Sequence, residues 1–377
     1  MLRFPHVTVL KRALVVGPYP GARWKSISNY TDGLVSMSGL DGVEMRAERA
    51  WWWLPPGIDR VMDARRGRVP LSPMAAEGAQ VVHLTDQGLG HHVPSFDGLP
   101  TVVTCHDVMP FLVPGYYRGA NWGMLRKLAL RQSLRGMAAA TRIVAVSEQT
   151  ARDITAVTGI PLERITVVGV PIPAWIRPMH DAEEVLARRG IGLPPGPRLL
   201  SVGNAASYKN LELLLRASAR PELAGAAIVR VGEPLTHRHR ELADRLGVSG
   251  RVVELGRIDE EALVAVYNAC TVLVQPSLYE GFGMPVMEAM ACGLPVVASD
   301  GGALPGTTGD AAVVVPLQPR EGAATRWARE LVRVLADADE RCRLRERGLA
   351  RAALFRPEPI ARQLLAVYRD AIAQVSG

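Results

Sequence analysis

Short apolar runs alternate with longer amphipathic stretches along the whole 377-residue chain. The runs are rich in valine, isoleucine and leucine, as expected for strands that are covered on both faces. Helical stretches between such strands indicate parallel pairing. In the first half the expected strands are 7–16, 43–46, 80–85, 100–105, 142–146 and 164–169. In the second half they are 198–202, 226–231, 251–255, 271–275, 295–298 and 312–315. The pattern predicts an α/β fold with two mainly parallel sheets.

The two halves are separated by a proline-rich stretch, 170–197, with a helical pattern at 181–189 in its middle. Proline clusters on either side of a helix suit a stiff connector between domains. We therefore expect a first domain over residues 1–172 and a linker over 173–197. A second domain should cover 198–356, and a last amphipathic helix should fill 357–377. A chain of this length suits two domains of ordinary size.

One stretch, residues 276–293, combines the end of a strand with a glycine-rich turn and a short helix. Its sequence is P-S-L-Y-E-G-F-G-M-P-V-M-E-A-M-A-C-G. Pro285 falls in the first turn of the expected helix, and Gly293 falls at its end. Backbone N–H groups at such a turn have no partner within the helix and suit an anion, phosphate above all.

Two carboxylates bracket this turn, Glu280 on the loop and Glu288 about one turn into the helix. The chain reverses between them, so both can face one cleft. Carboxylates accept hydrogen bonds and repel phosphate, so we expect them to hold hydroxyl groups on either side of it. A nucleotide sugar has this arrangement, because its diphosphate lies between the hydroxyls of the sugar ring and those of the ribose. Taken singly, each glutamate also fits an ordinary turn or surface position, and the interpretation depends on the whole string.

The string 276–299 resembles the signature of the retaining family-4 glycosyltransferases, which have the GT-B fold. The resemblance implies two Rossmann-like domains that face a central cleft, with the C-terminal helix crossing back to the N-terminal domain. It also implies that Glu280 holds hydroxyls of the donor sugar and that Glu288 holds the ribose. The implied contacts with the sugar and phosphates fall on Phe282, Gly283 and Met284.

Two positions in the first half lie at the ends of expected strands. The strand that ends at Gly17 is followed by a polar loop and a helix start, which again suits an anion. His106 and Asp107 follow the strand 100–105, where open α/β sheets bind ligands. A capping pair that closes the loop is the alternative. By the same resemblance, Gly17 faces the donor phosphates and His106 in T-C-H-D-V-M-P-F meets the donor sugar near its reacting carbon.

The first strand of the second half is followed by G-N-A-A-S-Y-K-N, which places Lys209 at an expected helix start. A lysine gains nothing from the helix dipole there, so an anionic ligand would explain it, and a surface lysine is the alternative. The resemblance implies that this segment binds the diphosphate. Many family members carry an arginine in the loop where this chain has Asn204, so the missing charge is expected from Arg23 or Lys25.

Two further segments are placed by the resemblance alone. Arg257 and Ile258 follow the strand 251–255 and are expected to pack on the nucleobase through the backbone, which separates uracil from guanine only weakly. After the strand 295–298, the family usually has a Pro-Glu pair, and this chain has Pro305 and Gly306 instead. The role of that glutamate is therefore not accounted for.

Charge is distributed unevenly between the halves. The net charge is +7. Residues 1–180 carry 20 Lys and Arg against 13 Asp and Glu, whereas residues 181–377 carry 24 of each. A basic first half attracts nucleic acid, anionic lipid or an acidic acceptor, and a general preference for arginine is the alternative. Trp51–Trp53 suit core packing for two of the three rings, and an acceptor or membrane contact is the alternative. The basic amphipathic stretch 116–135 suits a solvated outer helix, and contact with an anionic membrane surface is the alternative.

Other features limit the classes of protein that fit. No apolar run is long enough to span a bilayer, and the N-terminus suits a first strand better than a signal peptide. The four cysteines are scattered without metal-ligand spacing, which is typical of reduced thiols in a cytoplasmic protein. We expect no metal and no cofactor. A phosphorylase-like GT-B enzyme would need a lysine that carries pyridoxal phosphate, and no signature for one is found.

The sequence thus predicts a retaining, metal-independent glycosyltransferase, with His106, Lys209 and Glu280 as its catalytic residues. The donor would be a nucleoside diphosphate sugar, GDP-mannose-like or a UDP-sugar. The acceptor would be a hydroxyl of a glycan, a glycolipid or a small molecule. We expect a cytoplasmic location with an anionic membrane surface as a candidate contact, and no nucleic acid partner. The alternative is a non-catalytic nucleotide-sugar sensor or scaffold with the same fold.

Overall fold

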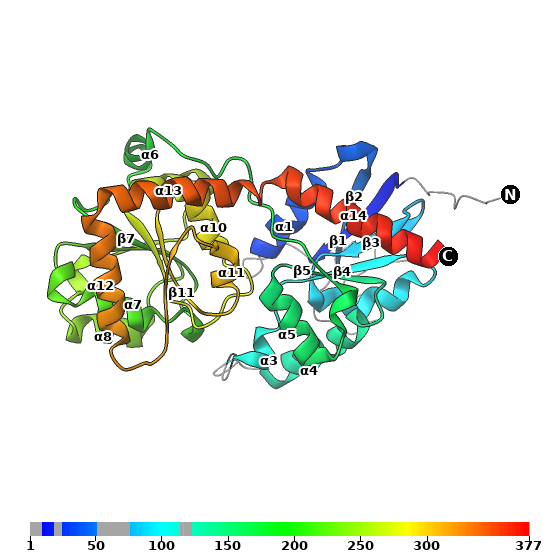
Figure 1. The fold of residues 1–377 in the computed structure, drawn as a ribbon, viewed down its shortest axis with the longest axis horizontal. Coiled ribbons are helices and arrows are strands. Elements are labelled where there is room, and N and C mark those ends of the chain that lie inside the picture. Colours follow the sequence, from blue (N-terminus) through cyan, green and yellow to red (C-terminus); the bar gives the residue numbers. More distant parts are fainter. Residues whose placement is uncertain (1–9, 19–24, 51–75, 114–115, 117–122, 377) are drawn as a thin grey trace. The chain divides into compact units, whose positions relative to one another are not determined.

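The computed structural model describes residues 10–18, 25–50, 76–113, 116 and 123–376. Contacts divide the chain into two compact units. The first consists of Met1–Pro171 with Arg356–Gly377, and the second of Ile172–Phe355. Each unit is built around one six-stranded sheet (Figure 1).

The sheet of the first unit has the order β2-β1-β3-β4-β5-β6, and every pairing in it is parallel. The strands are β1 (Arg12–Pro18), β2 (Glu44–Ala50), β3 (Val81–Leu84), β4 (Thr101–Cys105), β5 (Arg142–Ala145) and β6 (Ile165–Val167). The central strands β3 and β4 are buried along their whole length. This burial explains why they appear in the sequence as continuous apolar runs.

Helices cover both faces of this sheet. They are α1 (Lys25–Val35), α3 (Met109–Leu112), α4 (Gly123–Met137), α5 (Glu148–Thr158) and α14 (Pro357–Ser376). α4, α5 and the 3₁₀ stretch Gln87–Phe96 share one hydrophobic core with the strands. α14 contacts α1, β3 and β4, so the end of the chain packs on the first unit (Figure 1).

Polar contacts from buried or half-buried strand residues help to fix α14 to the rest of the first unit. Tyr368 Oη lies 2.7 Å from Nδ1 of the buried His83 on β3. Arg142 on β5 forms an ion pair of 2.6 Å with Asp370. Both contacts join residues that are far apart in the sequence, and no local pattern could predict them.

The sheet of the second unit has the order β12-β11-β10-β7-β8-β9 and is again entirely parallel. Its strands are β7 (Arg198–Gly203), β8 (Ala227–Gly232), β9 (Val252–Gly256), β10 (Val272–Gln275), β11 (Val296–Ser299) and β12 (Val313–Val315). The chain starts in the middle, at β7, and builds outward first on one side and then on the other. The switch point therefore lies between β7 and β10, where open parallel sheets bind ligands.

The helices of the second unit are α6 (Ala182–Arg188), α7 (Leu211–Ser218), α8 (His237–Arg245), α9 (Glu260–Ala269), α10 (Met284–Ala291), α11 (Leu304–Thr308), α12 (Ala323–Ala336) and α13 (Ala338–Ala353). α7, α8 and α12 share one core with the sheet, and the fully buried Trp327 on α12 is its largest side chain. α9 contacts α6, and α10 contacts α13.

The proline-rich segment expected as a linker, 173–197, packs on the second unit. Within it, the Met179 N–H donates to Asn268 Oδ1 at 2.9 Å. Arg189, just after α6, forms ion pairs with Asp259 and Glu261 at the start of α9. These contacts place the segment in the second unit.

The α/β fold with two parallel six-stranded sheets confirms the predicted fold class. Several details differ from the predictions. β1 begins at Arg12 and β2 extends to Ala50, farther than the expected strand 43–46. His91 and His92 are buried in the 3₁₀ stretch Gln87–Phe96. Among the described helices, none combines the length and the hydrophobicity that crossing a bilayer requires.

Candidate active site

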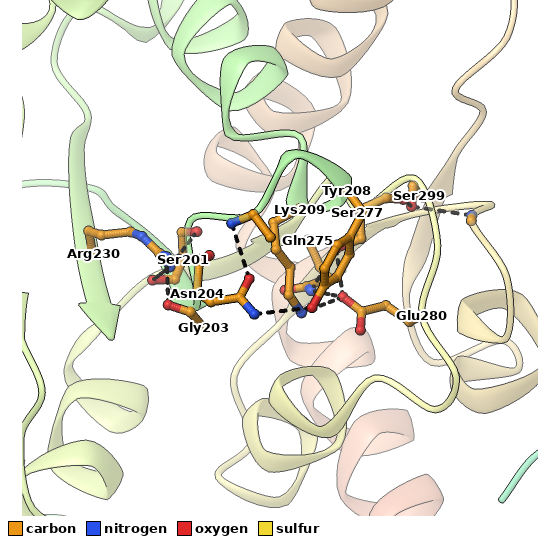
Figure 2. A network of polar contacts seen from close by, with 12 residues as sticks. Ser201, Gly203, Asn204, Tyr208, Lys209, Arg230, Gln275, Ser277, Glu280 and Ser299 are labelled. Atoms are coloured by element: carbon orange, nitrogen blue, oxygen red, sulfur yellow. Dashed lines mark hydrogen bonds and ion pairs between the residues drawn. The ribbon is translucent and has the colours of Figure 1, made fainter. Parts of the chain in front are cut away.

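The centre of the candidate site is a pair of opposite charges at the switch point of the second unit. Lys209 follows β7 and Glu280 follows β10, so both lie at the carboxyl edge of the sheet. Lys209 Nζ lies 2.7 Å from Glu280 Oε1. The two side chains are only 11% and 10% exposed, respectively. Figure 2 shows them pointing toward each other from the two loops.

Glu280 is held through one of its two carboxylate oxygens. Besides Lys209, Gln275 Nε2 at 2.7 Å and Ser277 Oγ at 2.6 Å donate to Oε1. The backbone of the same residue is also fixed, because Glu280 O accepts from Ala303 N at 2.9 Å. The described residues offer no hydrogen bond to Oε2. This oxygen is therefore the one available to accept from a ligand hydroxyl.

Lys209 stays charged in this setting. Burial alone would lower the pKa of its ammonium group. The neighbouring Glu280 carboxylate, with smaller contributions from other groups, outweighs burial and holds the pKa above its ordinary value. The expectation that Lys209 starts a helix is wrong in detail. Lys209 closes the 3₁₀ turn Ser207–Lys209, and Asn210, with φ +53°, separates that turn from α7.

The loop between β7 and Lys209 is ordered by Asn204. Its side-chain Nδ2 donates to Tyr208 Oη at 3.1 Å, and its Oδ1 accepts from Ala206 N at 3.2 Å. A neutral amide thus braces the loop at the position where the resemblance led us to expect an arginine. It supplies no charge to a phosphate.

The turn after Glu280 leads directly into α10. Gly283 is the N-cap residue, with φ +97°, a conformation that side chains with a Cβ rarely adopt. A Cβ there would also lie 2.8 Å from Leu304 Cδ2. Met284 and Pro285 form the first turn of the helix, as predicted from the sequence. The ring of Phe282 is buried and packs edge-on against Phe355, with 5.4 Å between the ring centroids.

Glu288 lies farther along α10 and has a different partner. Its Oε2 accepts a 2.7 Å hydrogen bond from Tyr267 Oη, which belongs to α9 and is buried. Burial raises the pKa of Glu288, and the bond from Tyr267 partly opposes that shift. No described contact joins Glu288 to the Lys209–Glu280 pair. The two glutamates are therefore held independently.

In the first unit, His106 lies directly after β4 and is partly exposed. Its Nε2 lies 2.9 Å from the carbonyl oxygen of Thr85, and its ring packs edge-on against Tyr30. Burial lowers the pKa of His106 to about 4, so the ring is neutral at pH 7. A neutral ring that donates from Nε2 has Nδ1 as an acceptor. His106 is thus suited to accept a hydrogen bond from a hydroxyl, and not to supply a positive charge.

Two neighbours of His106 complete this edge of the first unit. Asp107 Oδ1 accepts from Met109 N at 3.0 Å, which fits its expected role in orienting the loop. Gly17 is buried at the end of β1, next to α1. A Cβ there would lie 2.5 Å from Thr31 Oγ1, so a larger residue fits only if the Thr31 side chain shifts.

Family models and relatives agree with this geometry. Residues 45–173 match the model described as Glycosyltransferase Family 4, and residues 188–351 match the one described as Glycosyl transferases group 1. The chain belongs to the family-4 glycosyltransferases. The family expected from the motif 276–299 is thereby confirmed.

The curated relatives are described as D-inositol 3-phosphate glycosyltransferases. The protein of Nocardia farcinica is 33% identical over 252 residues, which cover 64% of this chain and 55% of the relative. The protein of Corynebacterium glutamicum is 31% identical over 225 residues, 56% of this chain and 53% of the relative. The chain thus spans about half the length of the curated relatives that it matches.

Solved structures share the fold at low sequence identity. Sucrose-phosphate synthase of Thermosynechococcus elongatus has a TM-score of 0.72 at 23% identity, covering 97% of this chain and 100% of that protein. Anabaena HepE in complex with UDP and glucose has a TM-score of 0.71 at 15% identity, covering 95% and 99%. These similarities confirm the GT-B fold.

The remaining predicted positions are less informative. Arg257 is exposed and Ile258 is half-buried just after β9, where the sequence placed them. Arg23, the side chain of Lys25 and the run Trp51–Trp53 lie outside the described residues.

Sequence reasoning missed four side chains that shape the site. Three of them, Gln275, Ser277 and Tyr208, hold the charged pair or its loop, and Tyr267 holds Glu288. Gln275 and Ser277 carried one usable signal, since both flank the end of an apolar strand that leads into the motif. Tyr267 gave none, because its partner lies 21 positions away on another helix.

Proposed function

We propose that this protein is a retaining glycosyltransferase that moves a sugar from a nucleoside diphosphate to an acceptor hydroxyl. The observation that carries the proposal is the buried Lys209–Glu280 pair at the switch point of the second sheet. A charged lysine and a carboxylate with one open oxygen, beside a helix N-terminus, match the two ends of a sugar diphosphate. Family membership supports the same reaction class.

The proposed roles follow from these positions. Lys209 and the N–H groups at Gly283 would stabilise negative charge on the departing diphosphate, which is electrostatic catalysis. Glu280 Oε2 would accept a hydroxyl of the donor sugar. In the first unit, His106 is proposed as a hydroxyl acceptor through its neutral ring. Glu288 would hold the ribose. A front-face mechanism with retention of configuration needs no nucleophile from the protein, and we assign none.

The donor and the acceptor are proposed as classes. HepE, which shares the fold, is solved with UDP and with UDP-glucose, so a UDP-sugar is the first donor to test, and a GDP-sugar is the second. The relatives' names point to a phosphorylated polyol acceptor. The surplus positive charge of residues 1–180 supports an anionic acceptor of that kind, free or at an anionic membrane surface.

A binding panel followed by product analysis tests the proposal. UDP, GDP and their sugars should be compared by thermal shift, since a ligand that binds the folded state raises its stability by mass action. The donor that binds is then incubated with acceptor pools, and the anomeric configuration of the product is read by NMR. Retention is expected, and inversion would refute the proposed stereochemistry. Donor binding without any turnover would favour the non-catalytic sensor.

Variants link the activity to the site. Lys209→Ala should lower kcat by roughly 100-fold or more, because a cation that meets charge growing in the transition state is lost. The matched control is Arg216→Ala, which removes an exposed cation from the neighbouring helix α7. If the Lys209→Ala variant folds and turns over as fast as Arg216→Ala, Lys209 has only a structural role.

A further inference from the structure

A buried arginine lies beneath the loop that precedes Lys209. Arg230 belongs to β8, is only 2% exposed, and interrupts an otherwise apolar strand. Among the described residues no ion pair with Arg230 is found and its Nε has no hydrogen-bond partner, while the carboxylates of Glu233 and Glu254 act on its charge from beyond ion-pair distance. A buried cation with an unsatisfied donor costs stability, so packing alone does not account for it.

The guanidinium group of Arg230 holds the end of β7 and its loop by their carbonyl groups. NH2 donates to Gly203 O at 2.6 Å and to Asn204 O at 2.7 Å. NH1 donates to Ser201 O at 3.3 Å and to Val231 O at 3.2 Å. Four backbone oxygens therefore turn toward one cation.

These bonds determine where the loop N–H groups point. In a trans peptide the C=O and the following N–H point in opposite directions. Since the carbonyls of Gly203 and Asn204 face Arg230, the N–H groups of Asn204 and Ala205 face away from it. Figure 2 shows Arg230 to one side of Gly203 and Asn204, and Lys209 with Glu280 to the other.

The loop already holds one anionic group on that outer side. Ala205 N donates to the exposed carboxylate of Glu233 at 3.2 Å. The N–H group is thus oriented toward an anionic group, and a phosphate would take the place of this exposed carboxylate. Arg230 also acts on Lys209 at longer range, since its charge works to lower the pKa of Lys209 against the stronger effect of Glu280.

We propose that Arg230 is a positioning residue for the donor diphosphate and supplies the positive charge that this chain lacks at Asn204. It orients the loop N–H groups toward the phosphates and adds a fixed charge beneath them, while Lys209 makes the direct contact. Burial lowers the pKa of Arg230 to about 10, so the guanidinium remains charged at neutral pH. This role rests on the proposed function, because it presupposes a diphosphate at this edge of the sheet.

Three variants test the role. Arg230→Gln removes the charge and keeps a shorter donor, whereas Arg230→Lys keeps the charge and loses the fork that spans two carbonyls. Arg251→Gln is the matched control. Arg251 also donates to backbone carbonyls, those of Leu223, Ala226 and Ser218, but it does so just before the amino end of β9, at the opposite edge of the sheet.

The readout is the ratio of two affinities measured by calorimetry, that for UDP or GDP and that for the matching nucleoside. Arg230→Gln should weaken binding of the diphosphate about tenfold, the scale of one unit charge acting over about 12 Å at an effective dielectric constant of about 20. The nucleoside should bind as it does to the wild type. Arg230→Lys should show a smaller loss, and Arg251→Gln should leave the ratio unchanged even if it lowers Tm.

The outcomes separate this role from the proposed function. If the wild type binds UDP or GDP and Arg230→Gln changes the ratio no more than Arg251→Gln does, the role of Arg230 is refuted and the proposed function stands. If Arg230→Gln does not fold, Arg230→Lys decides, and equal weakening of diphosphate and nucleoside would refute the role. A wild type that binds neither UDP nor GDP would refute both proposals.

Discussion

The ion pair of Lys209 and Glu280 leads to a prediction about stability that is independent of any ligand. Lys209→Met removes the cation and keeps the length of the side chain. Glu280→Gln removes the negative charge and keeps an oxygen for Gln275 and Ser277. The double variant removes both charges. Comparison of the three gives the coupling energy of the pair.

The magnitude follows from distance and burial. At 2.7 Å and an effective dielectric constant of about 20, the attraction is about 6 kcal/mol, and desolvation costs several kcal/mol for each ion. The intact pair therefore contributes a net free energy close to zero to the stability of the fold. Removal of one partner leaves the other charge buried, which should cost about 3 kcal/mol. The double variant should cost no more than either single one, so the coupling should reach about 3 kcal/mol.

The two single variants should not be equal. After Lys209→Met, Glu280 still accepts from Gln275 and Ser277. After Glu280→Gln, the ammonium group keeps only weaker partners, among them the ring of Tyr208 at 5.3 Å. We therefore expect the larger loss from Glu280→Gln.

The assay must report on the second unit alone, because a chain of two units need not unfold in one step. Hydrogen exchange of the peptides that cover β7 and β10, followed against urea, gives the free energy of opening of that unit. The control is the exposed pair Arg238–Glu212, whose oppositely charged atoms lie 2.9 Å apart with Arg238 78% exposed. Its coupling should stay below about 1 kcal/mol. If the single variants at Lys209 and Glu280 lose as little free energy of opening as the variants of the control pair, and if their losses add in the double variant, the burial argument is refuted.

Three further predictions concern other parts of the molecule. Glu288→Gln should raise the donor KM roughly tenfold and spare kcat, because hydrogen bonds to the ribose do not change during the reaction. Glu280→Gln should lower kcat by a larger factor than it raises KM. Steady-state kinetics in which both variants change kcat and KM in the same proportions would contradict this division. Gly283→Ala should destabilise the second unit by at least about 1 kcal/mol in the same exchange assay, because φ is +97° and a Cβ would meet Leu304. An unchanged free energy of opening would show that the turn can relax. The pKa of His83 is lowered to about 3 and that of His106 to about 4, both by burial, so the first unit should lose stability as pH falls below about 6.5. His83 alone should account for about 2 kcal/mol of the loss at pH 5, because there the residue is protonated in the unfolded state and neutral in the folded state. Urea unfolding at pH 7.5 and 5 measures this loss. If a His83→Gln variant keeps the full pH dependence of the free energy of unfolding, the loss comes from other groups.

Much of the fold could be predicted because burial in parallel sheets leaves a direct trace in the sequence. The strand expected at 198–202 is β7, Arg198–Gly203, and the strand expected at 271–275 is β10, Val272–Gln275. β2 was predicted too short for the opposite reason. It is an edge strand of sequence E-M-R-A-E-R-A, and its charged side chains obscure the strand pattern, although it pairs with β1 along seven positions.

The site was only partly predictable because its contacts join distant positions. The motif 276–293 located Glu280, Gly283 and Glu288 on the correct loop and helix. Nothing in the sequence indicated that Lys209, 71 positions earlier, would form an ion pair with Glu280. Arg230 did leave a signal, a charged residue inside an apolar strand, and such a residue is rarely buried without a reason. Its partners are backbone carbonyls, which carry no sequence pattern.

The pairing of Lys209 with Glu280 bears on how the proposed reaction would be accelerated. A diphosphate that binds beside Lys209 must share an ammonium group already balanced by a carboxylate, so its ground-state attraction is modest. As the bond to the sugar breaks, negative charge grows on the diphosphate and positive charge grows on the sugar. Lys209 is then drawn more strongly to the diphosphate, and the open oxygen of Glu280 favours the sugar. Both interactions increase toward the transition state, and only interactions of that kind raise kcat. Under the proposed function, the near-neutral ion pair thus serves the reaction step more than it serves donor binding or the stability of the fold.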